Sequence, residues 1–204
     1  MKPLNQQNNM QPSNQMPPQM NHGGHELMDA QETIGAVIGC MEQYVMYEGH
    51  TQDAELLAMN QRHRQFLSQM YNTMVDTLKT GQDPMTPTQS YQMEQANDIT
   101  YGLQASAPKS PAQSVNNIND ECISGFMIGG QKGIASALTA SALEATNPVL
   151  RRVFADSIPN VIEMAYEIFL YQNKNQYYQV PQLSNQDMQI LTNQYAPVSS
   201  PTQH

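Results

Sequence analysis

Two pairs of residues have the spacing that a di-metal helical bundle uses for its ligands. Such bundles take Glu-x-x-His from each of two helices and a single Glu from each of the other two. Asn60-x-x-His63 has this spacing, but an amide replaces the carboxylate. Glu163-x-x-Tyr166 also has it, but a phenol replaces the imidazole. With at most one carboxylate and one imidazole directed inward, the sequence does not predict a working di-metal centre, and His63 is interpreted as a hydrogen-bonded core histidine.

A second cluster of possible ligands is His22-Gly-Gly-His25-Glu26. Two imidazoles and a carboxylate can hold a transition metal, but zinc sites in proteins normally use four ligands, and these three lie on a flexible Gly-Gly element. The favoured interpretation is the start of a helix, with Glu26 near the positive end of the helix dipole. Binding of an adventitious metal by His22, His25, Glu26 or His63 stays open.

The two cysteines, Cys40 and Cys122, fall in the middle of expected helices. Buried free thiols behave as small apolar side chains, which is favoured over a disulfide between the two helices. No histidine lies near either cysteine in sequence to act as a base, no Ser/His/Asp set is evident, and Gly129-Gly130 lacks the pattern of a phosphate loop. The sequence therefore predicts no catalytic residue, no cofactor-binding residue, no metal ligand set and no enzyme.

Four stretches with apolar residues every three or four positions must position these side chains. The residues expected to face the core include Ile38 and Val45 in the first stretch, Leu56, Met59, Leu67, Met70 and Met74 in the second, Cys122, Phe126, Ile134 and Leu138 in the third, and Ile158 and Ile162 in the fourth. The four stretches predict helices at 26–48, 53–80, 114–145 and 148–172, with Gly49 and Gly81 as left-handed stops, Thr51 or Asp53 as a cap, and Asn147-Pro148 as a start signal. The long segment 81–113 contains Pro84, Pro87, Pro108 and Pro111 and is expected to cross the length of the bundle, with a possible short helix near 90–98. Short, long and short connections predict an all-α, ferritin-like four-helix bundle over residues 25–172.

Four glycines lie in the expected helix 114–145, at positions 125, 129, 130 and 133. Each lowers helix propensity by about 1 kcal/mol relative to alanine. Either a neighbouring helix approaches closely there, or the helix is kinked. The sequence does not separate these two interpretations.

The ends of the chain differ from the centre. Residues 1–24 are rich in Gln, Asn, Met and Pro and are expected to be a disordered arm. Residues 173–204 form a tail rich in Tyr and Gln, in which Tyr177 and Tyr178 either contact other subunits or dock on helix 148–172. Cross-linking through Tyr or through Gln and Lys is a further hypothesis, motivated by composition alone.

The composition excludes several classes of protein. The 204 residues include 26 Gln and 17 Asn, only 13% are charged, and the net charge is -9. This balance offers no basic surface for nucleic acid. No apolar run approaches the ~20 residues that span a bilayer, and the first 20 residues lack the apolar core of a signal peptide. The expectation is a soluble protein made inside a cell, with no small-molecule substrate identified.

Several stretches together have the pattern of a known family: His22 to Glu26, Cys122 to Met127, Thr146 to Ser157 followed by Pro159, Glu163 to Glu167, Tyr171 to Lys174, and Gln176 to Leu183. They resemble the spore coat F-type family of endospore-forming bacteria. The resemblance covers about residues 20–183. It implies a ferritin-like helical domain in the spore coat, made in the mother-cell cytoplasm and assembled with other coat proteins or with itself, with no catalytic residues to carry over. The alternative is a metal-dependent ferritin-like oxidase or manganese catalase.

Overall fold

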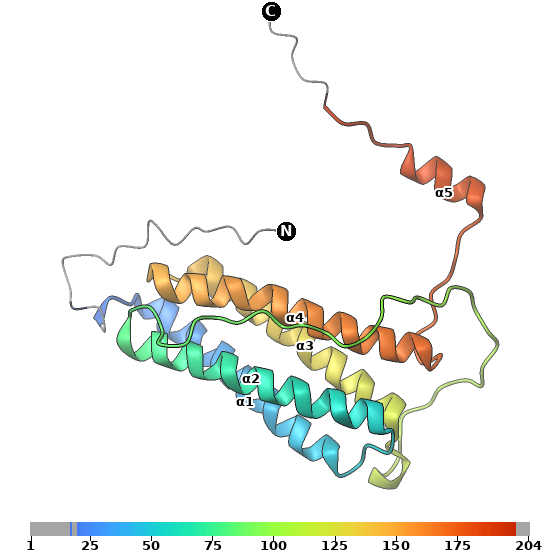
Figure 1. Cartoon of the computed structure of the whole chain (residues 1–204), viewed down its shortest axis with the longest axis horizontal. Helices are drawn as coiled ribbons and strands as arrows, with labels where there is room; N and C mark the ends of the chain where they lie inside the picture. Colours follow the sequence, from blue (N-terminus) through green and yellow to red (C-terminus); the bar gives the residue numbers. More distant parts are fainter. Residues whose placement is uncertain (1–16, 18–19, 199–204) are drawn as a thin grey trace, which may run out of the picture.

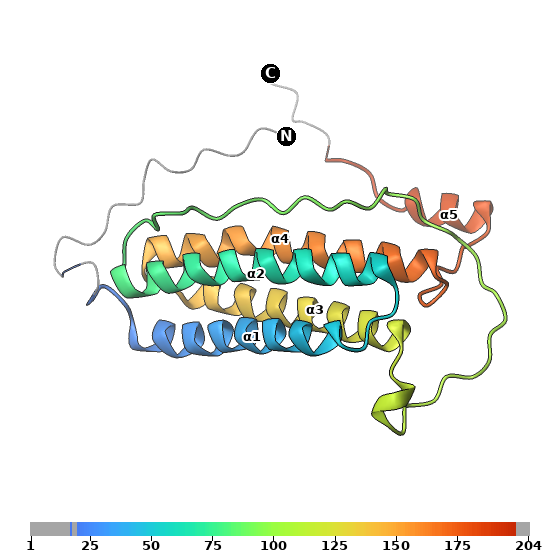
Figure 2. The same cartoon turned by 60° about the horizontal axis from the view of Figure 1, so that its bottom comes forward.

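The computed structural model describes residues 17 and 20–198, so most of the expected arm at 1–24 lies outside the described residues. Four long helices form the body of the molecule: α1 (Gly24–Glu48), α2 (Ala54–Thr80), α3 (Asp120–Glu144) and α4 (Pro148–Lys174). Each helix packs against two others, in the order α1, α2, α4, α3 around the bundle. Figures 1 and 2 show two antiparallel hairpins joined by one long connection, which confirms the all-α four-helix topology.

Capping residues set most helix ends. Asp53, rather than Thr51, caps α2 by accepting the N–H of Glu55 at 2.7 Å, and Asn147 caps α4 by accepting the N–H groups of Val149 and Leu150. Gly81 ends α2 with a φ of 65°, as expected, because glycine adopts the left-handed conformation without strain. Gly49 was expected to do the same after α1, but its φ is -74°. The prediction of a left-handed stop there is wrong, because a Thr51 N–H and hydroxyl bond to the Tyr47 carbonyl instead.

The helix α3 begins at Asp120, six residues after the expected start, because Asn119 caps it by accepting the N–H of Cys122. Only a short turn of 3-10 helix, η3 (Val115–Asn117), precedes it. A further helix, α5 (Asn185–Thr192), lies within the expected tail and was not anticipated. In Figures 1 and 2 it stands away from the bundle, and none of its residues is buried.

The connection between the hairpins begins with an extended strap, residues 81–102, along the α2–α4 seam (Figure 2). It then curves away from the end of the bundle in a wide loop that leads to η3 and α3 (Figure 2). It has no helix at 90–98. Three polar side chains of α4 hold its backbone, namely Asn160, Glu167 and Asn173. Asn160 accepts the Tyr91 N–H at 2.8 Å and donates to the Gln89 carbonyl, and Asn173 makes the equivalent pair with the N–H and carbonyl of Thr100. These side chains replace the partners that an extended strand finds in a sheet.

The apolar core confirms much of the expected pattern and corrects part of it. Along α2 the expected inward residues Leu56, Met59, Leu67, Met70 and Met74 are buried. The expected core residues Ile38, Val45, Phe126 and Ile162 are instead 37–55% exposed. On α3 the expected Ile134 and Leu138 are buried, but nearer its start the buried apolar positions are Ile123 and Met127, one residue after the expected Cys122 and Phe126.

The glycines of α3 do not all serve the packing of this chain. A Cβ at Gly130 would lie 3.3 Å from the Sγ of Cys40 on α1, so a neighbouring helix does approach closely at this position. A Cβ at Gly125, Gly129 or Gly133 would meet no atom within 4 Å, so close approach within the chain does not explain these three.

This difference gives a stability prediction. Gly129→Ala should raise the free energy of unfolding by about 1 kcal/mol, because alanine improves helix propensity and has open space. Gly130→Ala is the matched control and should gain less or lose, because its methyl group must displace the Cys40 thiol. Urea unfolding followed by circular dichroism measures both, and an equal gain in the two variants would contradict the packing at Gly130.

Candidate functional site

The most elaborate polar cluster in the described residues surrounds the carboxylate of Glu167 on α4. Its side chain is fully buried. Oε1 accepts from the Arg62 guanidinium at 2.6 Å and from the backbone N–H of Glu94 at 2.8 Å. Oε2 accepts from Nε2 of His63 at 2.8 Å and from the Tyr91 hydroxyl. The donors come from α2 and from the strap, so one carboxylate ties three segments together.

The four donors fill the hydrogen-bonding capacity of this carboxylate, because each oxygen offers about two acceptor positions. Burial by itself would raise the pKa of Glu167, but the hydrogen bonds from His63, Tyr91 and the Glu94 N–H outweigh it and lower the pKa to about 2. Glu167 is therefore an ionised carboxylate at neutral pH whose lone pairs are engaged by protein donors.

His63 continues the cluster toward the centre of the bundle. Its Nδ1 lies 3.3 Å from the Tyr44 hydroxyl, which in turn accepts from Nε2 of Gln131 on α3 at 2.8 Å. The carboxylate needs a donor at Nε2, so the network assigns the Nε2–H tautomer of a neutral imidazole. Burial lowers the pKa of His63 despite the neighbouring carboxylate. The prediction of a hydrogen-bonded core histidine is consistent with this geometry.

The residues of the two expected ligand pairs do not meet. Asn60 and His63 are fully buried, and Asn60 donates to the Tyr44 carbonyl at 3.1 Å. Glu163 and Tyr166, by contrast, are only half-buried on α4. The inward carboxylate is Glu167, one turn further on, which the sequence interpretation missed. Only its position between the buried Met164 and Ile168 could have indicated it.

The cluster at the start of α1 is divided by the structure. His22 and Glu26 contact each other through Nδ1 and Oε1, and both side chains are buried. His25 is 74% exposed and faces Asp29 instead. Glu26 accepts from the Thr146 hydroxyl at 2.6 Å, from the Asn147 N–H at 2.7 Å and from the Thr146 N–H. It therefore holds the turn between α3 and α4, in addition to lying in the first turn of α1.

The two cysteines are free thiols and form no disulfide. Cys40 is buried, and burial raises its pKa to about 12, so it is a poor nucleophile. The interpretation of Cys40 as a small apolar side chain is consistent with its contact with Gly130. Cys122 is half-buried near the start of α3.

Among the described residues, no three His, Cys, Asp or Glu side chains are grouped so that they could hold one metal ion. None of the helices in that part of the chain combines the length and the hydropathy needed to cross a bilayer.

Comparisons with known proteins identify the family. Residues 119–181, which comprise α3, α4 and the Tyr177-Tyr178 segment, match the Coat F domain. The chain is also 45% identical to the spore coat protein F-like protein YhcQ of Bacillus subtilis (strain 168) over 184 residues, which is 89% of this chain and 85% of that protein. No solved structure matches. The identity over most of both chains, together with the Coat F match, shows that the chain belongs to the spore coat protein F-like family.

Proposed function

We propose that this protein is a structural component of the bacterial endospore coat, a non-catalytic helical scaffold that assembles with other coat proteins after synthesis in the mother-cell cytoplasm. The observation that carries the proposal is the 45% identity to a spore coat protein F-like protein over most of both chains.

The chemistry of the buried cluster supports a scaffold. Glu167, His63 and Tyr91 have the residue types of a catalytic site. The polar atoms of the Glu167 side chain, however, are hydrogen-bonded to His63, to Tyr91 and to the backbone of the strap. Together they fix the crossover against α2 and α4. A substrate would have to displace those contacts to reach any of the three.

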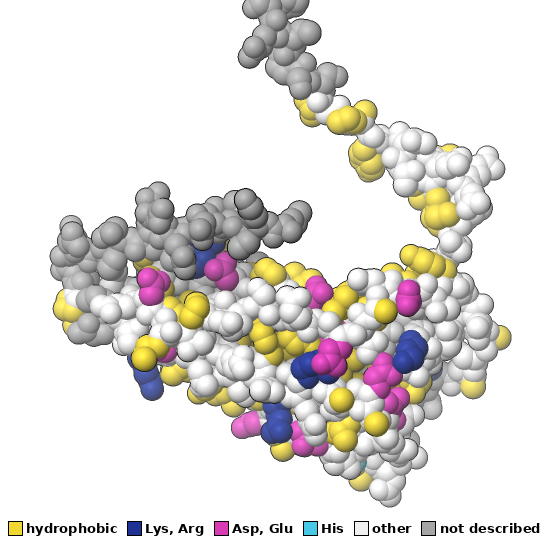
Figure 3. Space-filling view, in the orientation of Figure 1, with side chains coloured by type: hydrophobic (Ala, Val, Ile, Leu, Met, Phe, Trp, Pro, Cys, Tyr) yellow, Lys and Arg dark blue, Asp and Glu magenta, His cyan; other side chains and the backbone are white. Residues whose placement is uncertain are grey.

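The surface supports assembly. Uncharged polar and apolar side chains cover most of the face in Figure 3, and charged groups are scattered. Exposed apolar side chains include Met28, Met46, Leu143, Ile162 and Leu191. A surface with few ions loses little solvation energy when it is covered by a partner.

The tail divides into two parts. Tyr177 packs edge-to-face on Tyr171 with ring centroids 6.2 Å apart, and Tyr178 packs on Phe169 at 5.3 Å. These two tyrosines dock within the chain, which is the second of the two interpretations left open by the sequence. The contact role proposed for the tail therefore falls on the residues after Val180.

Location during sporulation tests the proposed function. A fluorescent fusion of the full chain should concentrate around the forespore and stay with purified spores through detergent washing. The fluorescent protein alone, expressed from the same promoter, is the control and should remain diffuse in the mother cell. A fusion as diffuse as this control, with the chain intact by immunoblot, would contradict a coat role.

Elemental analysis tests the absence of a metal-dependent activity. The protein purified from sporulating cells should carry substoichiometric iron and manganese, because Glu167 has no free lone pair for a cation. About one metal ion per chain, retained after residues 1–25 are removed, would support the ferritin-like oxidase or manganese catalase instead.

A further inference from the structure

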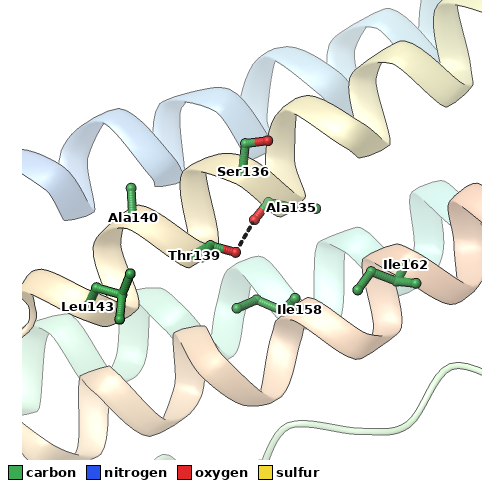
Figure 4. Close-up of a pocket in the computed structure, with 7 residues that line it drawn as sticks. All are labelled: Ala135, Ser136, Thr139, Ala140, Leu143, Ile158 and Ile162. Atoms are coloured by element: carbon green, nitrogen blue, oxygen red, sulfur yellow. Dashed lines mark hydrogen bonds between the residues drawn. The ribbon is translucent and has the colours of Figure 1, made fainter. Parts of the chain in front are cut away.

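An open apolar groove runs between α3 and α4 on the outside of the bundle (Figure 4). Its volume is about 480 Å³. Residues from both helices line it: Ala135, Ser136, Thr139, Ala140, Leu143, Ile158 and Ile162. None of these is charged. Leu143 is 80% exposed and Ile162 is 55% exposed, so the described chain leaves the groove uncovered.

The groove occupies one seam of the bundle, and the strap protects a different one. The backbone of the strap bonds to Asn160, Glu167 and Asn173, which hold it over the α2–α4 seam. No described segment of the chain covers the α3–α4 seam on the other side of α4 in this way. Ile158 and Ile162 are both expected in the core from the apolar stripe of α4. Ile158 is half-buried and packs against the core from the groove side, whereas Ile162 is 55% exposed.

The helix α5 carries apolar side chains that the described chain does not bury. Ser184 caps it by accepting the Asp187 N–H at 3.1 Å, and Met188 and Leu191 lie three residues apart on one side. Ile190 and Leu191 are 55% and 48% exposed, and no residue of α5 is buried. A helix of eight residues is not stable alone in water, because nucleation is unfavourable and few hydrogen bonds offset it. It needs an apolar surface on which to fold.

The tether of α5 limits its reach toward the groove of its own chain. Val180 is fixed to the strap, since its carbonyl accepts the Gly102 N–H at 2.9 Å and it pairs with Tyr101. Five Cα–Cα steps from Val180 to the start of α5 span about 18 Å at most. Ile162, at the near end of the groove, lies about 17 Å along α4 from Asn173, and the groove is on another seam of the bundle, so docking within one chain needs an almost fully extended tether. An α5 from another copy has no such restriction.

The charges around the groove suit α5. Lys132 lies on the face of α3 that carries Ser136 and Leu143, and Arg151 lies on the face of α4 that carries Ile158 and Ile162, as their helical spacing shows. No ion pair is recorded for Lys132 or Arg151, whereas five other cations of the described chain are paired. Asp187 in the first turn of α5 is the one charged residue between 181 and 198. The groove is therefore apolar, with Lys132 toward one end and Arg151 toward the other. The helix α5 has complementary properties, because it carries apolar side chains and the single negative charge of Asp187.

We propose that the α3–α4 groove binds α5 of a second copy of this chain, with Met188 and Leu191 on Leu143, Ile158 and Ile162. The proposal rests on the proposed function as a self-assembling coat scaffold and names the contact that it uses. Groove and helix are different surfaces, so the contact is heterologous. Such a contact either links many copies head to tail or forms a closed dimer in which each copy places its α5 in the groove of the other.

Sedimentation velocity of the full chain over a concentration series tests the contact. The unaltered chain should self-associate, and Ile162→Glu in the groove or Leu191→Glu in α5 should each weaken association about tenfold or more, because each buries a charge in the apolar contact. Val45→Glu on α1 is the matched control, since Val45 is 53% exposed and remote from the groove, and it should associate as the unaltered chain does. All three sites are exposed, so the variants should keep their helicity and melting temperature.

Mixing the two variants separates exchange between copies from docking within one chain. The Ile162→Glu chain keeps an intact α5 and the Leu191→Glu chain keeps an intact groove, so an equimolar mixture should form pairs that neither variant forms alone. An unaltered chain that stays monomeric to about 100 µM, variants that associate like the control, or a mixture without pairs would each overturn the proposal. If the fluorescent fusion of the full chain still surrounds the forespore, any of these results would contradict only this contact and not the proposed coat function.

Discussion

Replacing Glu167 by Gln should lower the free energy of unfolding by about 3 kcal/mol at neutral pH. The variant keeps the size of the side chain but removes the charge that Arg62 faces, and it places an NH₂ group against the donors of His63 and Tyr91. Removing one partner of a buried ion pair is strongly destabilising, because the other charge and the remaining donors stay desolvated. Urea unfolding followed by far-UV circular dichroism measures the loss.

Glu163→Gln is the matched control, since it makes the same change on the same helix one turn earlier. Glu163 is half-buried, and no hydrogen bond or ion pair is recorded for it. Its replacement should change stability by no more than about 0.5 kcal/mol. A loss at Glu167 no larger than at Glu163 would show that the four donors do not depend on the carboxylate.

The same carboxylate should make the protein sensitive to acid. The pKa of Glu167 falls from an ordinary 4.5 to about 2, so the folded state keeps the carboxylate ionised where the unfolded state has bound a proton. Its stabilisation is complete above about pH 5 and is lost as the pH falls toward 2. His63 acts in the same direction from about pH 6.5 downward, because the unfolded chain gains a proton that the buried imidazole resists. The advantage of the unaltered chain over Glu167→Gln should therefore shrink as the pH falls below about 5, and a constant difference across that range would contradict the low pKa of Glu167.

The architecture could be predicted from the sequence because its signals are local. Asp53, Gly81 and Asn147-Pro148 act within one helical turn, so the number of helices and most of their ends follow from nearby residues. The length of segment 81–113 then leaves room for a crossover along the bundle. The exceptions have physical reasons. The start of α3 is set by the capping hydrogen bond of Asn119, which the spacing of apolar residues does not indicate. The helix α5 is too short to produce a clear periodic pattern.

The site depends on a rotation of α4 that periodicity does not fix. Glu163 and Glu167 are four residues apart and differ by only about 40° around the helix, so either one fits an inward position. The true core face runs through Met164 and Ile168, which places Glu167 inside and leaves Ile162 outside. The hydrogen-bond partners of Glu167 lie on α2 and on the strap, so the sequence pattern of α4 does not predict them. For the same reason the apolar residues around the α3–α4 groove were assigned to the core.

Glu26→Gln should lower the free energy of unfolding by about 2 kcal/mol, the second large effect expected in this chain. Glu26 is 1% exposed and its Oε2 accepts from the Thr146 hydroxyl and from the N–H groups of Thr146 and Asn147. Burial opposes ionisation, but these bonds and the His22 contact lower the pKa of Glu26. The amide oxygen of glutamine can take the place of Oε2, but it accepts these three bonds without a charge, and the NH₂ group replaces the oxygen that contacts His22.

The loss at Glu26 should also be local, because the turn between α3 and α4 has only the residues 145–147. Hydrogen exchange at the Thr146 and Asn147 amides should speed up in Glu26→Gln by more than exchange in the centre of α2, since the two N–H groups lose an ionised acceptor. Glu32→Gln, on the exposed side of α1, is the control and should leave both rates unchanged. Equal acceleration throughout the bundle would mean that Glu26 contributes only to global stability. Selective acceleration at the turn would show that a residue at the start of the first helix holds the second hairpin closed, as its contacts across 120 positions of sequence require.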